Sequence, residues 1–218
     1  MDENHIVILS GGTISHVTPH LALCAPSYGK IGRDIELHLR RDKDLRPYLV
    51  NLYESKMAGG IDFDTVESLS ELLDKRLDDP LTKCIVIPAA VCDFKAKFIQ
   101  DADDSGQFYP IGKDKPRLKS KTGYKIDIEP YDKLIKRIKD RRPDILLVSF
   151  KTTTGLNLIE LQRAAEKALE ASNSNIVFAN DIENRLNTVY HKYYNDGGFN
   201  RVKATKILCK KIKDHLMK

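Results

Sequence analysis

Short apolar runs alternate with amphipathic segments of helical length along most of the chain. The clearest apolar runs lie at 5–9, 48–54, 84–88, 145–149 and 176–180. Most of them are apolar at successive positions rather than at every second one, which indicates strands buried on both faces, as in a parallel sheet. The alternating segment 188–194 precedes a glycine pair and predicts an edge hairpin.

Helical spacing of apolar residues appears in four of the intervening segments. These segments lie at 31–41, 65–77, 158–171 and 202–216. Each apolar stripe is expected to pack against the sheet, so we assign its residues to the core. The alternation of strands and helices predicts a three-layer α/β/α sandwich with right-handed crossovers, formed by a single domain over residues 1–218.

One stretch, 94–125, does not follow this alternation. It is long, polar, rich in lysine and poor in periodicity. A loop of that length inside a compact domain usually covers a binding site or is disordered. We therefore expect a mobile lid at about 95–125.

Composition narrows the possible functions. Hydrophobic residues make up 41% and charged residues 31% of the 218, as in ordinary soluble proteins. No apolar run approaches the roughly 20 residues that cross a bilayer, so we expect no membrane partner. The N-terminus lacks the shape of a signal peptide and the four cysteines are scattered, which predicts reduced thiols in the cytoplasm. The net charge of +5 comes without an RNA-binding motif or zinc finger, so no nucleic-acid partner is expected.

Glycines follow the first strand and precede the first helix. Gly11 and Gly12, with Thr13, leave backbone N–H groups open to a phosphate, although a plain tight turn is the alternative. Gly29 and Lys30 form a second candidate anion site, with an ordinary solvated helix start as its alternative.

Residues suited to a nucleotide follow later strands. Ala89 and Ala90 would let a flat ligand lie against the backbone. Asp93 could bond to a ribose or a base, hold a metal, or cap a helix, and Phe150 could stack on a base. The polar end of the strand at 177–182 belongs to the same set. Carboxyl ends of parallel strands meet on one rim of a sheet, so all of these are expected to converge.

Seven blocks carry a resemblance to a known family. They are SGGT at 10–13, GKIG at 29–32, PAAVCDF at 88–94, RLKSKTG at 117–123, SFK at 149–151, RAAEKALE at 163–170 and VFAND at 177–181. In this order they resemble phosphopantothenoylcysteine synthetase, the phosphopantothenate–cysteine ligase family, over nearly the whole chain. The resemblance implies a doubly wound, mostly parallel, Rossmann-like sheet and a homodimer.

The resemblance also implies an activity. Members join 4′-phosphopantothenate to cysteine in coenzyme A biosynthesis, through an acyl-nucleotide made from CTP or ATP with Mg²⁺. The flavin-binding half of bifunctional members is not matched, so we expect a stand-alone synthetase without FMN. A second lysine that bacterial members carry one helical turn after Lys167 is Ala171 here, which leaves CTP and ATP both open.

Individual site residues are implied in the same way. The nucleotide-binding positions of the family match Gly11, Gly12, Thr13, Ala89, Ala90, Asp93, Phe150 and Lys167. Lys30 matches the substrate loop. Arg117 falls on the lysine of the family's mobile loop, where Lys119 or Lys115 could serve after a small shift.

Other positions depart from the family pattern. The asparagine that handles the acyl intermediate is Ala25 here, and Leu21 and Thr18 stand where the family has an arginine and an aspartate. Ser27 and His20 are the nearest polar candidates for the asparagine's role. The alternative hypotheses are a relative that binds nucleotide or pantothenate and has lost the acyl-transfer step, or another nucleotide enzyme on this fold.

Two histidines lie four positions apart in the segment after the glycine turn. His16 and His20 could hold a metal or phosphate at i, i+4, but Pro19 argues against the helix that would align them. We therefore expect no metal site formed by the protein itself.

Overall fold

The computed structural model describes residues 3–102, 107–120, 123–192 and 194–218. A seven-stranded sheet lies at its centre, in the order β12-β11-β10-β9-β5-β1-β4. Its parallel strands are β1 (Asn4–Ser10), β4 (Tyr48–Glu54), β5 (Thr82–Val86), β9 (Leu146–Thr153) and β10 (Ile176–Asp181). The antiparallel strands β11 (Asn187–His191) and β12 (Tyr194–Phe199) complete one edge. The mostly parallel sheet and the edge hairpin are thus confirmed.

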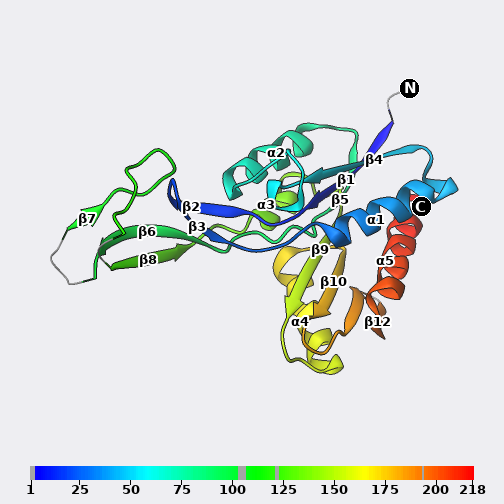
Figure 1. Cartoon of the computed structure of the whole chain (residues 1–218). Helices are drawn as coiled ribbons and strands as arrows, with labels where there is room; N and C mark the ends of the chain where they lie inside the picture. Colours follow the sequence, from blue (N-terminus) through cyan, green and yellow to red (C-terminus); the bar gives the residue numbers. More distant parts are fainter. Residues whose placement is uncertain (1–2, 103–106, 121–122, 193) are drawn as a thin grey trace.

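Helices cover both faces of this sheet (Figure 1). One face carries α1 (Lys30–Arg41) and α5 (Arg201–Leu216), and the other carries α2 (Val66–Asp78), α3 (Leu134–Arg141) and α4 (Leu158–Ser172). Alternate residues of one strand feed the two cores: Ile6 and Ile8 pack toward α1, whereas Val7 and Leu9 pack toward α2. This double burial explains why β1 is apolar at successive positions.

The strand order sets the position of a crevice. From β1 the chain crosses through α1 to β4 on one side, whereas β5 and β9 follow on the other side of β1. The direction of winding therefore reverses between β1 and β5. In open α/β sheets, ligands bind at such a switch point, outside the carboxyl ends of the strands.

An arm of three antiparallel strands projects from the body (Figure 1). It consists of β6 (Phe94–Asp101), β7 (Phe108–Tyr109) and β8 (Tyr124–Pro130), and lies against the hairpin of β2 (Ile14–Thr18) and β3 (Leu21–Cys24). The sequence pattern predicted irregular structure here, which is wrong for these strands. A register shift between Ala96 and Phe98 interrupts the alternation that would have revealed β6. Whether the arm moves as a lid stays a prediction.

The arm is fixed at its root by a half-buried tyrosine, Tyr131. The Tyr131 hydroxyl donates to Glu67 Oε1 over 2.7 Å and lies 2.9 Å from Ser15 Oγ, and the Tyr131 N–H donates to Asp93 O. Burial and the neighbouring Glu67 carboxylate raise the pKa of Tyr131 to about 12, so the hydroxyl keeps its proton at neutral pH. Any motion of the arm is therefore expected beyond this root.

None of the helices within the described ranges is long and apolar enough to span a membrane.

Candidate functional site

The glycine turn after β1 lies beside the alanine pair after β5. Ala90 N–H donates to Gly11 O over 2.9 Å, and Thr13 N–H donates to Ala90 O over 3.0 Å. Gly12 and Ala90 form a parallel bridge that continues the pairing of the two strands. The structure therefore brings Gly11, Gly12, Ala89 and Ala90 together at the switch point, as the sequence predicted.

Gly12 has a packing role that the sequence did not reveal. A Cβ at this position would lie 2.3 Å from Ala25 O, 2.6 Å from Met57 Sδ and 2.8 Å from Ser27 N. The space left by the missing side chain is thus filled by the segment that leads into α1. Glycine at position 12 allows this segment to close over the end of β1.

The side chain of Thr13 is buried in the turn, whereas that of Asp93 is exposed. Thr13 is fully buried, and its hydroxyl accepts the Cys92 N–H over 2.8 Å, so it stabilises the turn itself. Asp93 is exposed and directly precedes β6, which excludes the helix-cap reading. Its carboxylate stays a candidate ligand group at the rim.

The segment at 25–29, just before α1, is held over the glycine turn. Ala25 N–H donates to Thr13 O over 3.1 Å, and Ser27 N–H donates to Met57 Sδ over 3.4 Å. Gly29 adopts a φ of 75°, the left-handed conformation that favours glycine, and begins α1 without a side-chain cap. Ser27 therefore lies against Gly12, and Lys30 is exposed at the first position of α1.

His20 is separated from this loop. It is exposed in the turn between β2 and β3, and the four residues of β3 stand between it and Ala25. At about 3.3 Å per residue of strand, that is roughly 13 Å. The two candidates for the asparagine's role, His20 and Ser27, therefore lie on different loops. His16 lies on β2, so the helical i, i+4 geometry of a histidine pair is absent as well.

Phe150 and Lys167 lie on opposite faces of the sheet. The Phe150 ring stacks on Phe178 at 5.3 Å between centroids, in the core beside α1 and α5. Lys167 is exposed on α4, which covers the other face. The structure does not bring these two predicted nucleotide contacts together within one chain.

Arg117 and Lys119 are exposed on the arm, between β7 and β8. The Tyr124 hydroxyl bonds to both the backbone N–H and the carbonyl of Lys119 over 3.0 Å. Gly112 N–H donates to Val17 O, which fixes this segment to the hairpin that lies on the arm. Both basic residues thus belong to the part of the molecule that projects from the sheet.

Asp181 stabilises a loop, a role that its position at a strand end did not predict. Its carboxylate accepts the N–H groups of Gly155, Leu156 and Asn184 and the Thr153 hydroxyl, at 2.9 to 3.2 Å. Burial opposes ionisation, but these four hydrogen bonds outweigh it and lower the pKa of Asp181 to about 2. Asp181 therefore fixes the loop from β9 into α4 rather than offering its carboxylate to a ligand.

Replacing Asp181 by asparagine is expected to lower stability in a pH-dependent way. The folded pKa lies below the unfolded value of about 3.9, so the carboxylate stabilises the fold fully above that pH and loses this effect as pH falls toward 2. Urea midpoints of wild type and D181N should differ clearly at pH 7 and converge between pH 4 and 2. A constant difference across this range would contradict the assigned role.

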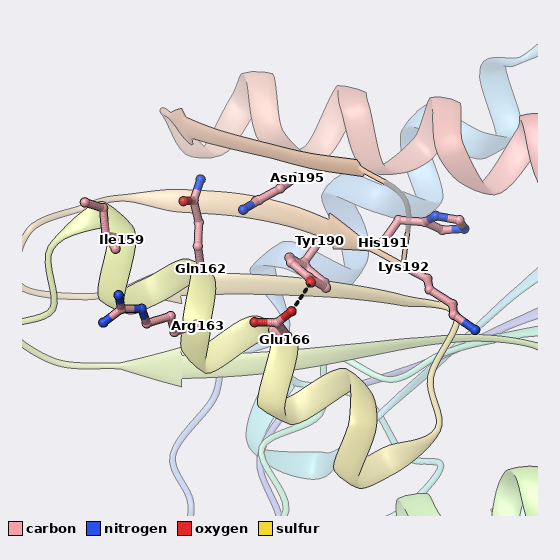
Figure 2. A pocket seen from close by; sticks show the side chains of 8 residues that line it. All are labelled: Ile159, Gln162, Arg163, Glu166, Tyr190, His191, Lys192 and Asn195. Carbon is pink, nitrogen blue, oxygen red and sulfur yellow. Dashed lines mark hydrogen bonds between the residues drawn. The ribbon is translucent and has the colours of Figure 1, made fainter.

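A shallow hollow of about 360 Å³ lies elsewhere, between α4 and the edge strands (Figure 2). Its lining consists of Ile159, Gln162, Arg163, Glu166, Tyr190, His191, Lys192 and Asn195. The Tyr190 hydroxyl donates to Glu166 Oε1 over 2.8 Å across its floor. None of the residues predicted for the nucleotide or substrate lines this hollow.

Across the described ranges, no three His, Cys, Asp or Glu side chains gather as a metal-binding group. A Mg²⁺ ion commonly binds through one or two carboxylates together with substrate phosphates. The exposed Asp93 at the rim fits that mode, in which the ion arrives with the nucleotide.

The chain is similar in sequence to known proteins. The family model described as the DNA/pantothenate metabolism flavoprotein C-terminal domain matches residues 1–206. The chain is 28% identical over 192 residues to the coenzyme A biosynthesis bifunctional protein CoaBC of Thermococcus kodakarensis. That match covers 84% of this chain and 42% of the relative, so the chain spans about two fifths of the relative's length.

Solved structures share the fold. The DNA/pantothenate metabolism flavoprotein from Streptococcus pneumoniae superposes with a TM-score of 0.82 at 16% identity, over 98% of this chain and 100% of that one. The C-terminal domain of CoaBC superposes with a TM-score of 0.70 at 18% identity, over 100% of this chain and 97% of that one. A Cab2 mutant in complex with phosphopantothenate-cysteine gives 0.66 at 14% identity, over 98% and 87%.

Proposed function

Because the chain belongs to the family of DNA/pantothenate metabolism flavoprotein C-terminal domains, we propose that it is a phosphopantothenate–cysteine ligase of coenzyme A biosynthesis. The observation that carries the proposal is the switch-point crevice, where the glycine turn, the alanine pair and the loop with Ser27 and Lys30 meet. The similar coenzyme A biosynthesis protein and the neighbour complexed with phosphopantothenate-cysteine support the same substrates.

The proposed reaction has two steps. A carboxylate oxygen of 4′-phosphopantothenate attacks the α-phosphorus of CTP or ATP, which forms an acyl-nucleotide and releases pyrophosphate. The cysteine amine then attacks the acyl carbon, loses a proton, and expels the nucleoside monophosphate. Holding the reacting groups in place and stabilising the negative charge that develops are the main sources of rate in such transfers.

The crevice supplies residues for both needs. The nucleotide would lie along Gly11 and Ala90, with Asp93 at the rim. Lys30 at the start of α1 would neutralise the phosphate charge, and Ser27 would orient the acyl group. Mg²⁺, held by the triphosphate and Asp93, would neutralise further charge when bound. This chemistry does not require FMN.

A homodimer is part of the proposal. Phe94, Phe108 and Ile128 expose between 45 and 62% of their surface on the arm, and a second copy would cover this apolar surface. Arg117 and Lys119 on the same arm, like Lys167 on α4, would then act toward the crevice of a second copy. All four cysteines are free thiols, which supports a reducing cytoplasmic location.

Residues 113–120, between β7 and β8, are expected to close as a lid over the triphosphate. This stretch is basic and mostly exposed, and it lies beyond the Tyr131 root, so bound phosphates would reduce its self-repulsion. Trypsin should cut near Lys113 to Lys119 in the free protein and more slowly with nucleotide and Mg²⁺. Cleavage of an unrelated protein under the same conditions controls for inhibition of trypsin, and equal rates with and without ligand would refute closure.

Ala25 favours a second candidate function. The family's asparagine is missing there, so the chain would bind nucleotide and pantothenate without completing acyl transfer. Pyrophosphate release with CTP or ATP separates the two candidates, provided that it requires 4′-phosphopantothenate. A ligase releases pyrophosphate in proportion to product, whereas a binding protein releases none.

A further inference from the structure

An arginine holds the segment that carries Ser27 and Lys30. It lies outside the seven sequence blocks that carry the family resemblance. Arg33, in the first turn of α1, donates from Nη2 to Tyr28 O and from Nη1 to Ala58 O, the latter over 3.2 Å. The same Nη1 pairs with Glu54 Oε1 at the carboxyl end of β4. One guanidinium thus joins the loop, the strand end and the short helix η2 (Lys56–Ala58).

Glu54 is itself fixed, so it can seat the guanidinium. Its N–H donates to Asp62 Oδ2 over 2.8 Å, and its carbonyl accepts the Asp62 N–H over 3.1 Å. A Cβ on Gly60 would lie 2.3 Å from Glu54 O, so the turn closes tightly around this residue. The Glu54 side chain is only 18% exposed.

Gly29 lies directly against this ion pair. A Cβ there would stand 2.4 Å from Glu54 Oε1 and 2.9 Å from Arg33 Nη1. The Gly29 carbonyl also accepts the Ser10 hydroxyl over 3.2 Å and the Arg33 N–H over 3.1 Å. Two successive carbonyls are therefore fixed: that of Tyr28 by the Arg33 side chain, and that of Gly29 by the Arg33 N–H and by Ser10 at the end of β1.

We propose that Arg33, seated by Glu54, is a positioning residue that holds Ser27 and Lys30 in the geometry needed for acyl transfer; this rests on the proposed ligase function. An exposed ion pair alone contributes little. Here the planar fork of arginine serves two backbone carbonyls and a carboxylate at once, which a lysine cannot reproduce. A shift of about 1 Å in a reacting group can cost about 10²-fold in rate.

Steady-state kinetics of the full chain test the kinetic consequence. We expect R33A to lower kcat about 10- to 100-fold while KM for the nucleotide changes less than about twofold. R33K should recover little, because it keeps the charge and loses the fork. R41A removes a charge from an exposed position in the last turn of the same helix and should behave as wild type. Full recovery in R33K would overturn the proposal.

Hydrogen exchange tests the loop without relying on activity. In R33A, amides of the 25–31 segment should exchange faster, whereas those of α5 should keep wild-type protection. Unchanged exchange at 25–31 would overturn the proposal whatever the kinetics show, and faster exchange throughout would indicate global destabilisation and also reject it. If wild type releases no pyrophosphate, the ligase function fails separately, and exchange alone decides whether Arg33 holds the loop.

Discussion

Gly12→Val is expected to abolish ligase activity and to destabilise the fold. Its Cβ would lie 2.3 Å from the Ala25 carbonyl oxygen, and backbone cannot rotate away as a flexible side chain can. Overpacking of this kind costs about 1–3 kcal/mol. The glycine turn along which the nucleotide would lie, and which pairs with Ala90, should be distorted, so nucleotide affinity measured by calorimetry should fall more than about tenfold.

Gly59→Ala is the matched control for this variant. Gly59 has open space at its Cβ position but a φ of 90°, so the change there tests backbone strain alone. Gly12 does not have a positive φ, so its cost comes from contact alone. Wild-type urea midpoint and affinity in Gly12→Val would show that the loop does not pack against the turn.

Ser27→Ala is expected to slow amide formation by at least about tenfold while nucleotide affinity changes little. An alanine methyl at position 25 neither donates nor accepts a hydrogen bond. Ser27, two residues on and with its backbone N–H against Gly12, is the proposed substitute. Loss of one oriented hydrogen bond to developing charge typically costs about 10²–10³ in rate. Rapid-quench analysis of the second step measures the effect.

Two further variants test the role assigned to Ser27. Ala25→Asn restores the family's residue and should leave activity unchanged or raise it. His20→Ala should have a smaller effect than Ser27→Ala, because His20 lies at the far end of the β2–β3 hairpin. If His20→Ala proves the more damaging, the active site includes the hairpin turn and the geometry assigned to Ser27 is wrong.

The sheet was predictable because its strands are buried on both faces. Burial at successive positions gives β1 and β10 each four apolar residues in a row, a pattern typical of strands inside a parallel sheet. Helix α3 escaped prediction, since it has only eight residues and five of them are charged. The strands of the arm were not predicted because a bulge interrupts the alternation of apolar and polar residues in β6.

The site was only partly predictable, for a different reason. Strand ends predict which residues reach the rim, so the approach of Gly12 to Ala90 followed from sequence. Which face of the sheet a side chain lies on depends on strand register, and the sequence does not reveal that register. The positions of Phe150 and Lys167 on opposite faces could therefore not be predicted. Hydrogen-bond partners such as those of Asp181 and Arg33 come from loops distant in sequence, and no local pattern encodes them.

Mass-spectrometric detection of the product tests the central claim most directly. Purified protein is incubated with Mg²⁺, 4′-phosphopantothenate and cysteine, with CTP in one series and ATP in another. The proposed function predicts 4′-phosphopantothenoylcysteine in an amount equal to the pyrophosphate released, and an acyl-nucleotide when cysteine is omitted. Bound nucleotide without either compound, in wild type and in Ala25→Asn alike, would contradict the ligase and support a binding protein.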